Sequence, residues 1–424
     1  MRRFAFIFLV SAFVGFASGH ELSTFYAPGV GAKAMGMGGA FVAMSGDPSC
    51  LFWNPAGCAW AKKPSGYVEG VHEERWSATQ QGGYVYPAYY SSSDTPQSYS
   101  SSNTSPRAVA LLLPFKEMVI GLGAYVPHET HLRDGTYVFR GHSVEPRSVG
   151  QVKRMALSFS TGKKVSGLPR VSVGFNLNYD RLHYERATYS HTAYSDSFSY
   201  YRGFFNNEVV DMNETLFDAQ GFNFDIGALV ETEDGLSLGL KAGVASDWEG
   251  DGTVRHYHYY YSHERDSIRD TTTVQEESPS SSFKSLVSSP QFITLGLRLH
   301  QENLSFGIEL TAYRQEQQQQ PGGVGGGSGS FYYYYSPDLF KSWDLPTIRA
   351  GLEVQPRKGF FIRGGAYAYG FSGFGDAHEP AAFTLGLGYE RKGLRADLAV
   401  ERQSEGTLEK STRATLGLTY ALGK

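Results

Sequence analysis

The 424-residue sequence has little of several features that mark common classes of protein. It contains two cysteines, Cys50 and Cys58, so a framework of several disulfides is excluded. Beyond the first 19 residues, no apolar run approaches the roughly 18 to 20 residues that a membrane-spanning helix needs. An excess of positive charge is also missing, because 38 lysines and arginines face 42 aspartates and glutamates. The net charge of −4 argues against nucleic acid as a partner.

We find no constellation of residues that predicts an enzyme, and we expect no catalytic residue and no cofactor. The most suggestive cluster is His256, His258 and His263, because alternate residues of a strand share a face and could gather a metal. No cysteine or second pair of ligands stands nearby. We therefore interpret this stretch as a solvated, tyrosine-rich loop and expect no metal site.

The first 19 residues have the features of a secretion signal. Met1-Arg2-Arg3 is a charged start, residues 4–16 form an apolar core, and Ala17-Ser18-Gly19 is a small-residue cleavage site. We expect a signal peptide over residues 1–19 and export to the periplasm. The outer membrane or secretion then remains as the destination.

Residues 20–64 predict a compact, mostly irregular plug. The stretch is too rich in glycine for a helix and too rich in small apolar residues for a disordered linker. Asp47-Pro48 and Asn54-Pro55 force turns on either side of residues 51–53. The residues that we expect to shape the plug are Gly29, Gly31, Gly36, Gly38, Gly39, Asp47, Asn54, Pro55 and Gly57.

Other interpretations of this stretch stay open. Residues 29–34 fit a loose dinucleotide-binding fingerprint, but a signal peptide stands where its strand should be. The stretch could also be an arm that merely fills space. Cys50 and Cys58 could close a small loop by a disulfide in an oxidising compartment, or they could be two small buried hydrophobic residues.

From residue 65 onward, apolar and polar residues alternate with the period of a β-strand. Val171, Val173 and Phe175 would point one way, while Ser172 and Asn176 point the other. The strands that this pattern predicts are 65–76, 107–114, 118–126, 153–163, 169–182, 221–232, 236–247, 291–300, 304–314, 346–356, 360–370, 382–390, 394–402 and 412–422.

The lengths of the connections distinguish a membrane barrel from a soluble sandwich. Short turns alternate with long excursions, including 183–220 and 249–290, as in outer-membrane barrels. Mean hydropathy of −0.32 fits strands that face lipid on one side and a lumen on the other. We predict an all-β protein, a transmembrane antiparallel barrel of about 14 strands over residues 65–424. Its lumen is too wide for side chains to fill, so the plug folds inside it.

Two groups of residues are candidates for contact with a substrate. Arg298, Arg349 and Arg363 fall on the polar face and could bind a carboxylate, or could pair with acidic neighbours. Aromatic stretches at 84–90, 257–261 and 331–335 could make the first contact with an apolar molecule, or could belong to an aromatic girdle. The predicted loop 183–220 adds further candidates for capture, which are Phe204, Phe205, Val209, Leu216 and Phe217.

The plug also resembles a known family. The run from Gly31 to Ala43, Asp47-Pro48-Ser49 and Asn54-Pro55-Ala56-Gly57 are similar to the N-terminal hatch of FadL/TodX-type outer-membrane transporters. Later segments resemble that family's barrel more weakly, and the terminal Lys424 departs from the aromatic ending of many such barrels.

The resemblance implies a monomeric barrel in the outer membrane of a Gram-negative-type bacterium, surrounded by outer-membrane lipid. It would pass a hydrophobic compound, such as a long-chain fatty acid or a hydrocarbon, without energy input. Capture by loops, an apolar pocket and a rearrangement of the hatch would be its steps. A non-transporting barrel that serves as a surface scaffold or secretion accessory stays open as the alternative.

Overall fold

A computed structural model gives the fold of the chain. The structure describes residues 29–79, 97–133, 137–139, 142–144, 147–164, 169–198, 203–244, 246–265, 270–277, 280–288, 291–314, 344–368, 381–405 and 409–422. The predicted signal peptide and the aromatic stretches 84–90 and 331–335 lie outside these ranges. Within them, no helix is both long enough and apolar enough to cross a membrane.

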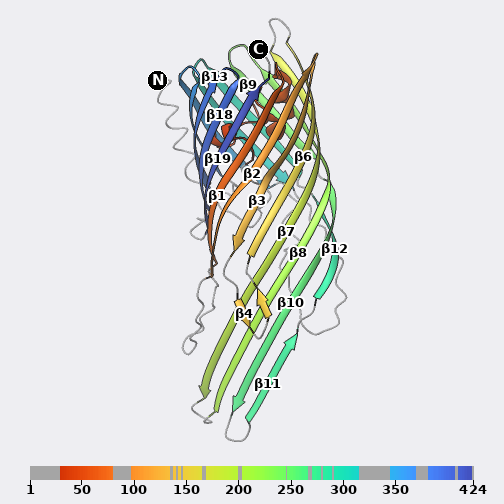
Figure 1. Cartoon of the computed structure of the whole chain (residues 1–424), viewed down its shortest axis with the longest axis vertical. Coiled ribbons are helices and arrows are strands. Elements are labelled where there is room, and N and C mark those ends of the chain that lie inside the picture. Colours follow the sequence, from red (N-terminus) through yellow and green to blue (C-terminus); the bar gives the residue numbers. More distant parts are fainter. Residues whose placement is uncertain are drawn as a thin grey trace.

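Fourteen antiparallel strands form a closed barrel, which confirms the predicted fold class (Figure 1). The last strand pairs with the first from Ser65↔Ala421 to Ser77↔Glu409, and this pairing closes the cylinder. The barrel strands are β1 (Ser65–Thr79), β2 (Gln97–Phe115), β3 (Met118–Arg133), β6 (Arg147–Lys163), β7 (Arg170–Phe198), β8 (Gly203–Glu231), β9 (Leu236–Val244), β13 (Gln291–Gln301), β14 (Leu304–Arg314), β15 (Asp344–Arg357), β16 (Phe360–Ala368), β17 (Ala381–Arg391), β18 (Leu394–Glu405) and β19 (Glu409–Ala421).

On one side the sheet continues far beyond the rest of the barrel, and we call this part the extension (Figure 1). Strands β7 and β8 are each 29 residues long. β10 (Asp247–Arg265) pairs with β8, and β12 (Ser280–Ser288) and β11 (Asp270–Glu277) pair with β10. A small separate hairpin joins β4 (Tyr137–Phe139) to β5 (His142–Val144).

The extension corrects the prediction of loops at 183–220 and 249–290. Most of both ranges is strand, because long ladders to β7, β8 and β10 satisfy their backbone groups even where the side chains are polar. The five predicted capture residues, Phe204 to Phe217, therefore lie in β8 rather than in a loop. His256, His258 and His263 likewise lie in β10.

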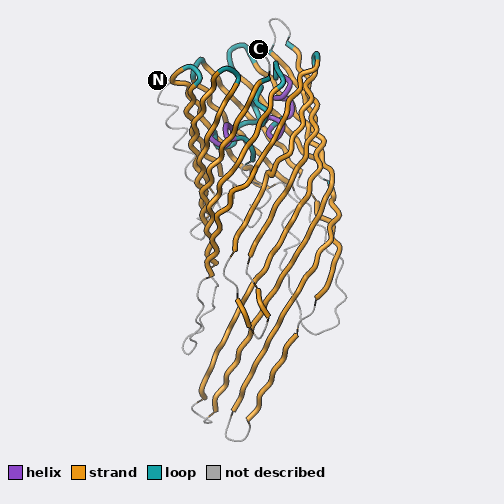
Figure 2. Tube along the Cα trace, viewed as in Figure 1, coloured by secondary structure: helices purple, strands orange, loops and turns teal. Residues whose placement is uncertain are grey.

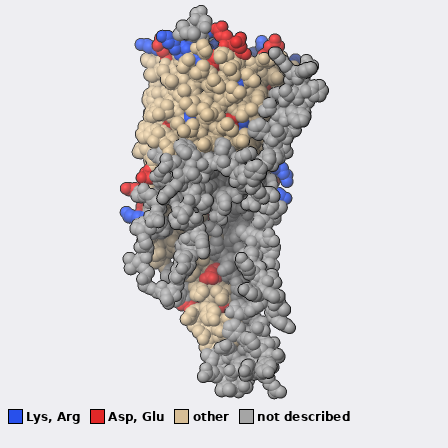
Figure 3. All heavy atoms as spheres, turned by 180° about the vertical axis from the view of Figure 1, so that it is seen from behind, with Lys and Arg blue, Asp and Glu red and all other residues tan. Residues whose placement is uncertain are grey.

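The alternation of side chains separates an apolar outer wall from a polar interior. On β7, Val173 and Phe175 are exposed, whereas Asn176 and Asn178 are fully buried on the lumen side. Figure 3 shows an outer wall of mostly uncharged residues, with charged residues gathered at the rim that carries the short turns. This pattern is that of a barrel whose outer face contacts lipid.

Residues 29–64 lie inside the barrel, near the end that carries the short turns (Figure 2). We call them the hatch. It contains three short helical segments, α2 (Ala32–Gly36), α3 (Cys50–Trp53) and η2 (Pro55–Trp60). Most of its apolar side chains are buried, and those of Met37, Phe41 and Leu51 are at most 1% exposed. The hatch therefore supplies the hydrophobic core that the wide lumen needs.

Glycines on both partners let the hatch backbone touch the wall backbone. Gly38 has a φ of +63°, and a Cβ on it would lie 2.6 Å from the backbone nitrogen of Ala366. Reciprocally, a Cβ on Gly365 would lie 2.3 Å from the nitrogen of Gly38, and one on Gly351 would lie 2.1 Å from the oxygen of Met37. No side chain fits at these contacts. The hatch thus packs more closely than ordinary side-chain contacts permit.

Candidate functional site

Two carboxylates of the wall hold the first half of the hatch. Glu309 on β14 accepts hydrogen bonds from the backbone nitrogens of Phe41 at 3.0 Å and Val42 at 2.9 Å. Its other oxygen accepts from Arg349 at 2.9 Å. Glu69 on β1 accepts from the backbone nitrogen of Gly31 at 2.7 Å. Buried backbone N–H groups that have no helical partner are thus satisfied by charge-assisted bonds.

Donors from the opposite wall hold the second half of the hatch. Asn176 on β7 donates to the carbonyl of Leu51 at 2.6 Å, and Lys241 on β9 donates to the carbonyl of Phe52 at 2.7 Å. Asn54 donates to the carbonyls of Val42 at 2.8 Å and Ala228 at 3.1 Å, so it bridges hatch and wall. Asn54, predicted as one of the residues that shape the plug, thus holds hatch and wall together.

Inside the hatch, Lys33 and Asp47 have shifted pKa values. Burial lowers the pKa of the Lys33 ammonium, although the nearby carboxylate of Glu353 opposes the shift. Burial alone would raise the pKa of Asp47, but the charges of Lys33 and Arg395 and hydrogen bonds from Ser49 outweigh it, so this pKa lies below its ordinary value. Asp47 is therefore ionised in the docked hatch.

A polar layer lines the lumen next to the hatch, on β6 to β9. Arg154 donates two hydrogen bonds of 2.7 Å to Asp180, and Lys241 lies 3.1 Å from Asp225. Asn178 joins the layer by donating to Asp225 at 3.1 Å. Arg154 is half-buried and the other groups are buried, and all of them are engaged with one another.

Two residues further along the same strands, the lumen face becomes apolar. We call this group the mouth cluster, because it lies where the extension leaves the barrel. Its buried members are Val152, Leu182, Phe217, Ala219 and Trp248, and Tyr184 packs against them. Val152 lies two residues before Arg154 on β6, and Leu182 lies two residues after Asp180 on β7. The cluster and the polar layer therefore share one face of the sheet. Of the predicted capture residues, Phe217 belongs to this cluster.

The barrel ladder is interrupted between β2 and β3, beside the mouth cluster. The two strands pair from Phe115↔Met118 up to Ala108↔Tyr125 and again at Ser100↔Arg133, while residues 101–107 and 126–132 do not pair with each other. Residues 128–132 of β3 pair on their other side with 148–152 of β6, which includes Val152 of the cluster. We call this interruption the wall break.

Both strands carry a bulge and a proline at the wall break. The register between β1 and β2 shifts at Glu69/Gly70, next to Pro106, and that between β3 and β6 shifts at Tyr125/His128, next to Pro127. Proline lacks the N–H that a ladder needs, and a bulge bends its strand away from the partner. The sequence itself therefore prevents β2 and β3 from pairing here.

The hatch contacts the edge of the wall break. The Phe52 ring packs edge-on against Tyr125, with ring centroids 5.4 Å apart. Tyr125 is the last residue of β3 to pair with β2 before the break. A movement of α3 would therefore alter the packing at this edge.

Outside the barrel, a groove of about 490 Å³ begins next to the wall break. Its lining is almost entirely apolar and crosses the outer face of β2, β3, β6, β7 and β8. Val109, Leu122, Met155 and Phe222 are among the exposed residues of this lining. Beyond it the outer face turns polar, where His72 bonds Thr104 at 2.8 Å. The wall break thus lies at the margin of the apolar outer wall.

The three predicted carboxylate-binding arginines occupy different environments. Arg349 is paired with Glu309, and Arg363 lies 2.7 Å from Glu353 and 2.9 Å from Asp397. Arg298 is half-buried and donates to Ser305 at 2.8 Å. The structure thus favours internal pairing, the second of the two open interpretations, for Arg349 and Arg363.

The remaining predicted residues of the hatch are buried. Asp47 accepts from the backbone nitrogen of Ser49 at 2.9 Å, and a Cβ on Gly57 would lie 2.4 Å from the carbonyl of Met44. Cys50 and Cys58 are free, buried thiols, and burial raises the pKa of Cys50 to about 12. This arrangement matches the interpretation of two small buried hydrophobic residues.

Comparison with solved structures gives matches over nearly the whole chain. A Pseudomonas aeruginosa FadL homologue matches with a TM-score of 0.59 and 14% identity, covering 97% of this chain and 100% of its own. The Ralstonia pickettii toluene transporter TbuX matches with 0.58 and 12%, and the P. putida toluene transporter TodX with 0.59 and 14%; each covers 94% of this chain and 100% of its own.

No family model matches the sequence, and no curated protein matches it. At 12 to 14% identity, the structural matches establish the fold, including its closed barrel of 14 strands. The chain is a β-barrel with the fold of the FadL homologue and of the toluene transporters TbuX and TodX.

Proposed function

We propose that this barrel is a monomer that passes a hydrophobic compound from outside the cell into the outer membrane without energy input. The compound would leave sideways, through the wall of the barrel. The compound would collect at the mouth cluster, leave through the wall break and enter the apolar groove. The observation that carries this proposal is the position of the wall break directly beside the cluster. The names of TbuX and TodX as toluene transporters support the class of substrate.

A lateral route fits the energetics of an apolar cargo. Straight passage down the lumen would bring the compound against the polar layer and the docked hatch, where buried groups such as Arg154 and Asp180 bond each other. Separating such groups in a dry interior costs several kcal/mol. The wall break instead leads from one apolar surface to another, so the compound loses little of its hydrophobic stabilisation.

A hatch rearrangement would control the width of this route. Phe52 of α3 packs on Tyr125, so a shift of α3 would release the edge of β3 that borders the break. Lys241 and Asn176 hold the carbonyls of α3, and these two bonds would set how easily α3 moves. A compound bound at the mouth cluster would favour the shifted position of α3 by occupying the space beside the cluster.

A disulfide across the wall break tests the proposal. Ser100 pairs with Arg133 at the far end of the break, so Ser100→Cys with Arg133→Cys would hold the two strands together there. The matched control is Phe383→Cys with Arg402→Cys, a pair in the intact ladder of β17 and β18. Both would be made in a chain with Cys50→Ala and Cys58→Ala.

Uptake of radiolabelled toluene and oleate would be measured in cells with and without a reductant. We expect the disulfide across the break to reduce uptake at least tenfold, reversibly on reduction, and the control pair to leave it unchanged. Undiminished uptake with the break closed would refute the lateral route. No uptake of either probe by the unmodified protein would favour the surface scaffold or secretion accessory.

A further inference from the structure

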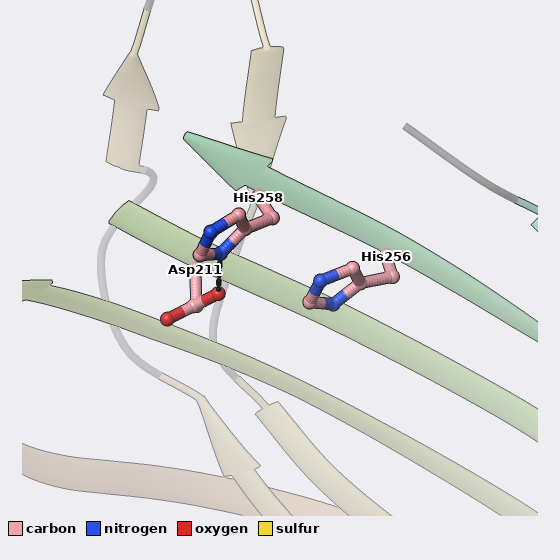
Figure 4. A group of neighbouring side chains, drawn as sticks. All are labelled: Asp211, His256 and His258. Carbon is pink, nitrogen blue, oxygen red and sulfur yellow. Dashed lines mark hydrogen bonds and ion pairs between the residues drawn. The ribbon is translucent and has the colours of Figure 1, made fainter. Parts of the chain in front are cut away.

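We propose that Asp211, His256 and His258 form a binding site for a divalent transition-metal ion on the extension. One potential ligand atom of each residue lies within 4.8 Å of those of the other two. Figure 4 shows both imidazoles, from β10, and the carboxylate, from β8, on the same side of the two strands. The three side chains are half-buried. This site is separate from the proposed transport route.

The strand register brings these residues together. His256 and His258 are two apart on β10, so they point to the same face of the sheet. In the ladder between β8 and β10, His258 stands directly opposite Asp211, and His256 stands opposite Asn213. Paired residues of adjacent strands have Cα atoms about 4.5 to 5.5 Å apart, which suits side chains that share one ion. The backbone therefore fixes the spacing of the ligands.

Existing contacts already orient both rings. His258 Nδ1 lies 2.7 Å from Asp211 Oδ1, and His256 Nδ1 is hydrogen-bonded to Asn213 Oδ1. The two imidazole planes are nearly parallel, at 11°, with centroids 6.0 Å apart. Small rotations of the side chains would bring the three ligand atoms to the spacing that a coordinated ion requires. A contact to a residue that is not itself a ligand, like that of His256 with Asn213, commonly holds metal-binding histidines in place.

The ligand set selects the kind of ion. Two imidazoles and one carboxylate suit Zn²⁺ and related ions such as Co²⁺, Ni²⁺ and Cu²⁺, whereas Ca²⁺ and Mg²⁺ prefer oxygen ligands alone. Three protein ligands on a half-buried surface leave room for water to complete the coordination. Because the ligands come from β8 and β10, a bound ion would cross-link the two strands far from the barrel. We infer that the ion stiffens the extension.

Titration of the purified full-length protein with Zn²⁺ alone tests the site. The protein would carry no histidine tag, and calorimetry would give stoichiometry and affinity. We expect one ion per chain, and at least tenfold weaker binding in His258→Ala and in His256→Ala. The matched control is His183→Ala on β7. His183 also bonds carboxylates, Asp218 at 3.0 Å and Glu185 at 3.2 Å. It does not belong to the group of Asp211, His256 and His258.

Co²⁺ spectra and gel mobility separate the possible outcomes. Visible absorption of bound Co²⁺ would report its ligands, and the heat-dependent gel mobility of the barrel would show that each variant is folded. Binding that is lost in His258→Ala and His256→Ala, but kept in His183→Ala, would support the site. Equal binding in all folded variants, or an equal loss in all three, would overturn it, because surface histidines in general would then hold the ion.

Discussion

Replacement of Glu309 by glutamine should weaken the docking of the hatch, while the hatch stays inside the barrel. The carboxylate accepts from the backbone nitrogens of Phe41 and Val42 and from Arg349, at 2.9 to 3.0 Å. A glutamine amide has the same size but only one acceptor oxygen. Its NH₂ group would face some of the N–H donors that the second carboxylate oxygen accepts from. Breaking a buried ion pair costs about 3 to 5 kcal/mol, and we expect the lower end, about 3 kcal/mol, because one acceptor stays.

The thiol of Cys50 provides the assay. It is fully buried, and burial raises its pKa to about 12, so it reacts with a maleimide at pH 8 only when the hatch moves. In a Cys58→Ala background, labelling of Cys50 counts opening events of the hatch. A loss of about 3 kcal/mol corresponds to labelling that is roughly 100-fold faster, since 1.4 kcal/mol is a factor of ten.

The control is Glu401→Gln, which breaks a buried pair with Arg413 at 3.4 Å. Glu401 has no hydrogen bond to the hatch among the described contacts, so Glu401→Gln should label Cys50 at the rate of the unmodified hatch. If Glu309→Gln also labels at that rate, the carboxylate does not hold the hatch. If both variants label equally fast, the wall as a whole has been weakened, and our reasoning about Glu309 fails.

Three further predictions concern the hatch and the mouth cluster. Burial raises the pKa of Cys50 to about 12 and also raises that of Cys58, so the effect of Cys50 is measured in a Cys58→Ala background. There the contribution of Cys50 to docking is complete below pH 9 and should fall by about 1.4 kcal/mol per pH unit between pH 9 and 12. Adding Cys50→Ala should remove that slope from the hydrogen exchange of hatch amides. Gly365→Ala should increase hydrogen exchange in the hatch at least tenfold, because its Cβ would lie 2.3 Å from Gly38. Gly364→Ala should not, because its Cβ would meet nothing nearer than 3.9 Å. Equal exchange in the two variants would contradict the close packing. Phe217→Ala should weaken binding of an apolar fluorescent probe about tenfold in equilibrium titration, from lost apolar contact, and unchanged affinity would remove the mouth cluster from the route.

The barrel itself was predictable from the sequence because each strand shows its two environments in its own residues. Lipid on one side and a buried, polar interior on the other impose strict alternation, and all 14 predicted strands correspond to strands of the barrel. Tight turns such as Lys358-Gly359 also fix register. That register makes Glu353 and Arg363 direct partners on β15 and β16. This pairing could not have been found from the turn alone, because the register shifts between Val354 and Arg357.

The extension was not predicted because much of its sequence is polar. Residues 188–200 are largely serine, threonine, tyrosine and histidine, which resemble a loop in composition. A signal was nevertheless present in His256-Tyr257-His258-Tyr259, where the tyrosines are buried and the histidines half-buried in a strict period of two. The metal ligands could not be predicted completely, because Asp211 joins the histidines only through the register of β8 on β10.

The wall break and the hatch contacts depend on several strands at once. Pro106 and Pro127 are visible in the sequence, but their opposition appears only when β2 and β3 lie side by side. Similarly, nothing local distinguishes Gly365, which meets the hatch, from Gly364, which does not. Which wall glycine lies against the hatch is set by the stagger of the whole cylinder.

The backbone contacts between hatch and wall also have a consequence for biogenesis. Glycines on β7, β8, β9, β13, β15, β16 and β17 all lie against the hatch, and β1 begins directly after it. A hatch that packs this closely against so many strands could hardly enter a barrel that has already closed. We expect the nascent sheet to curl around the hatch as a template, with β1 and β19 zipping together last.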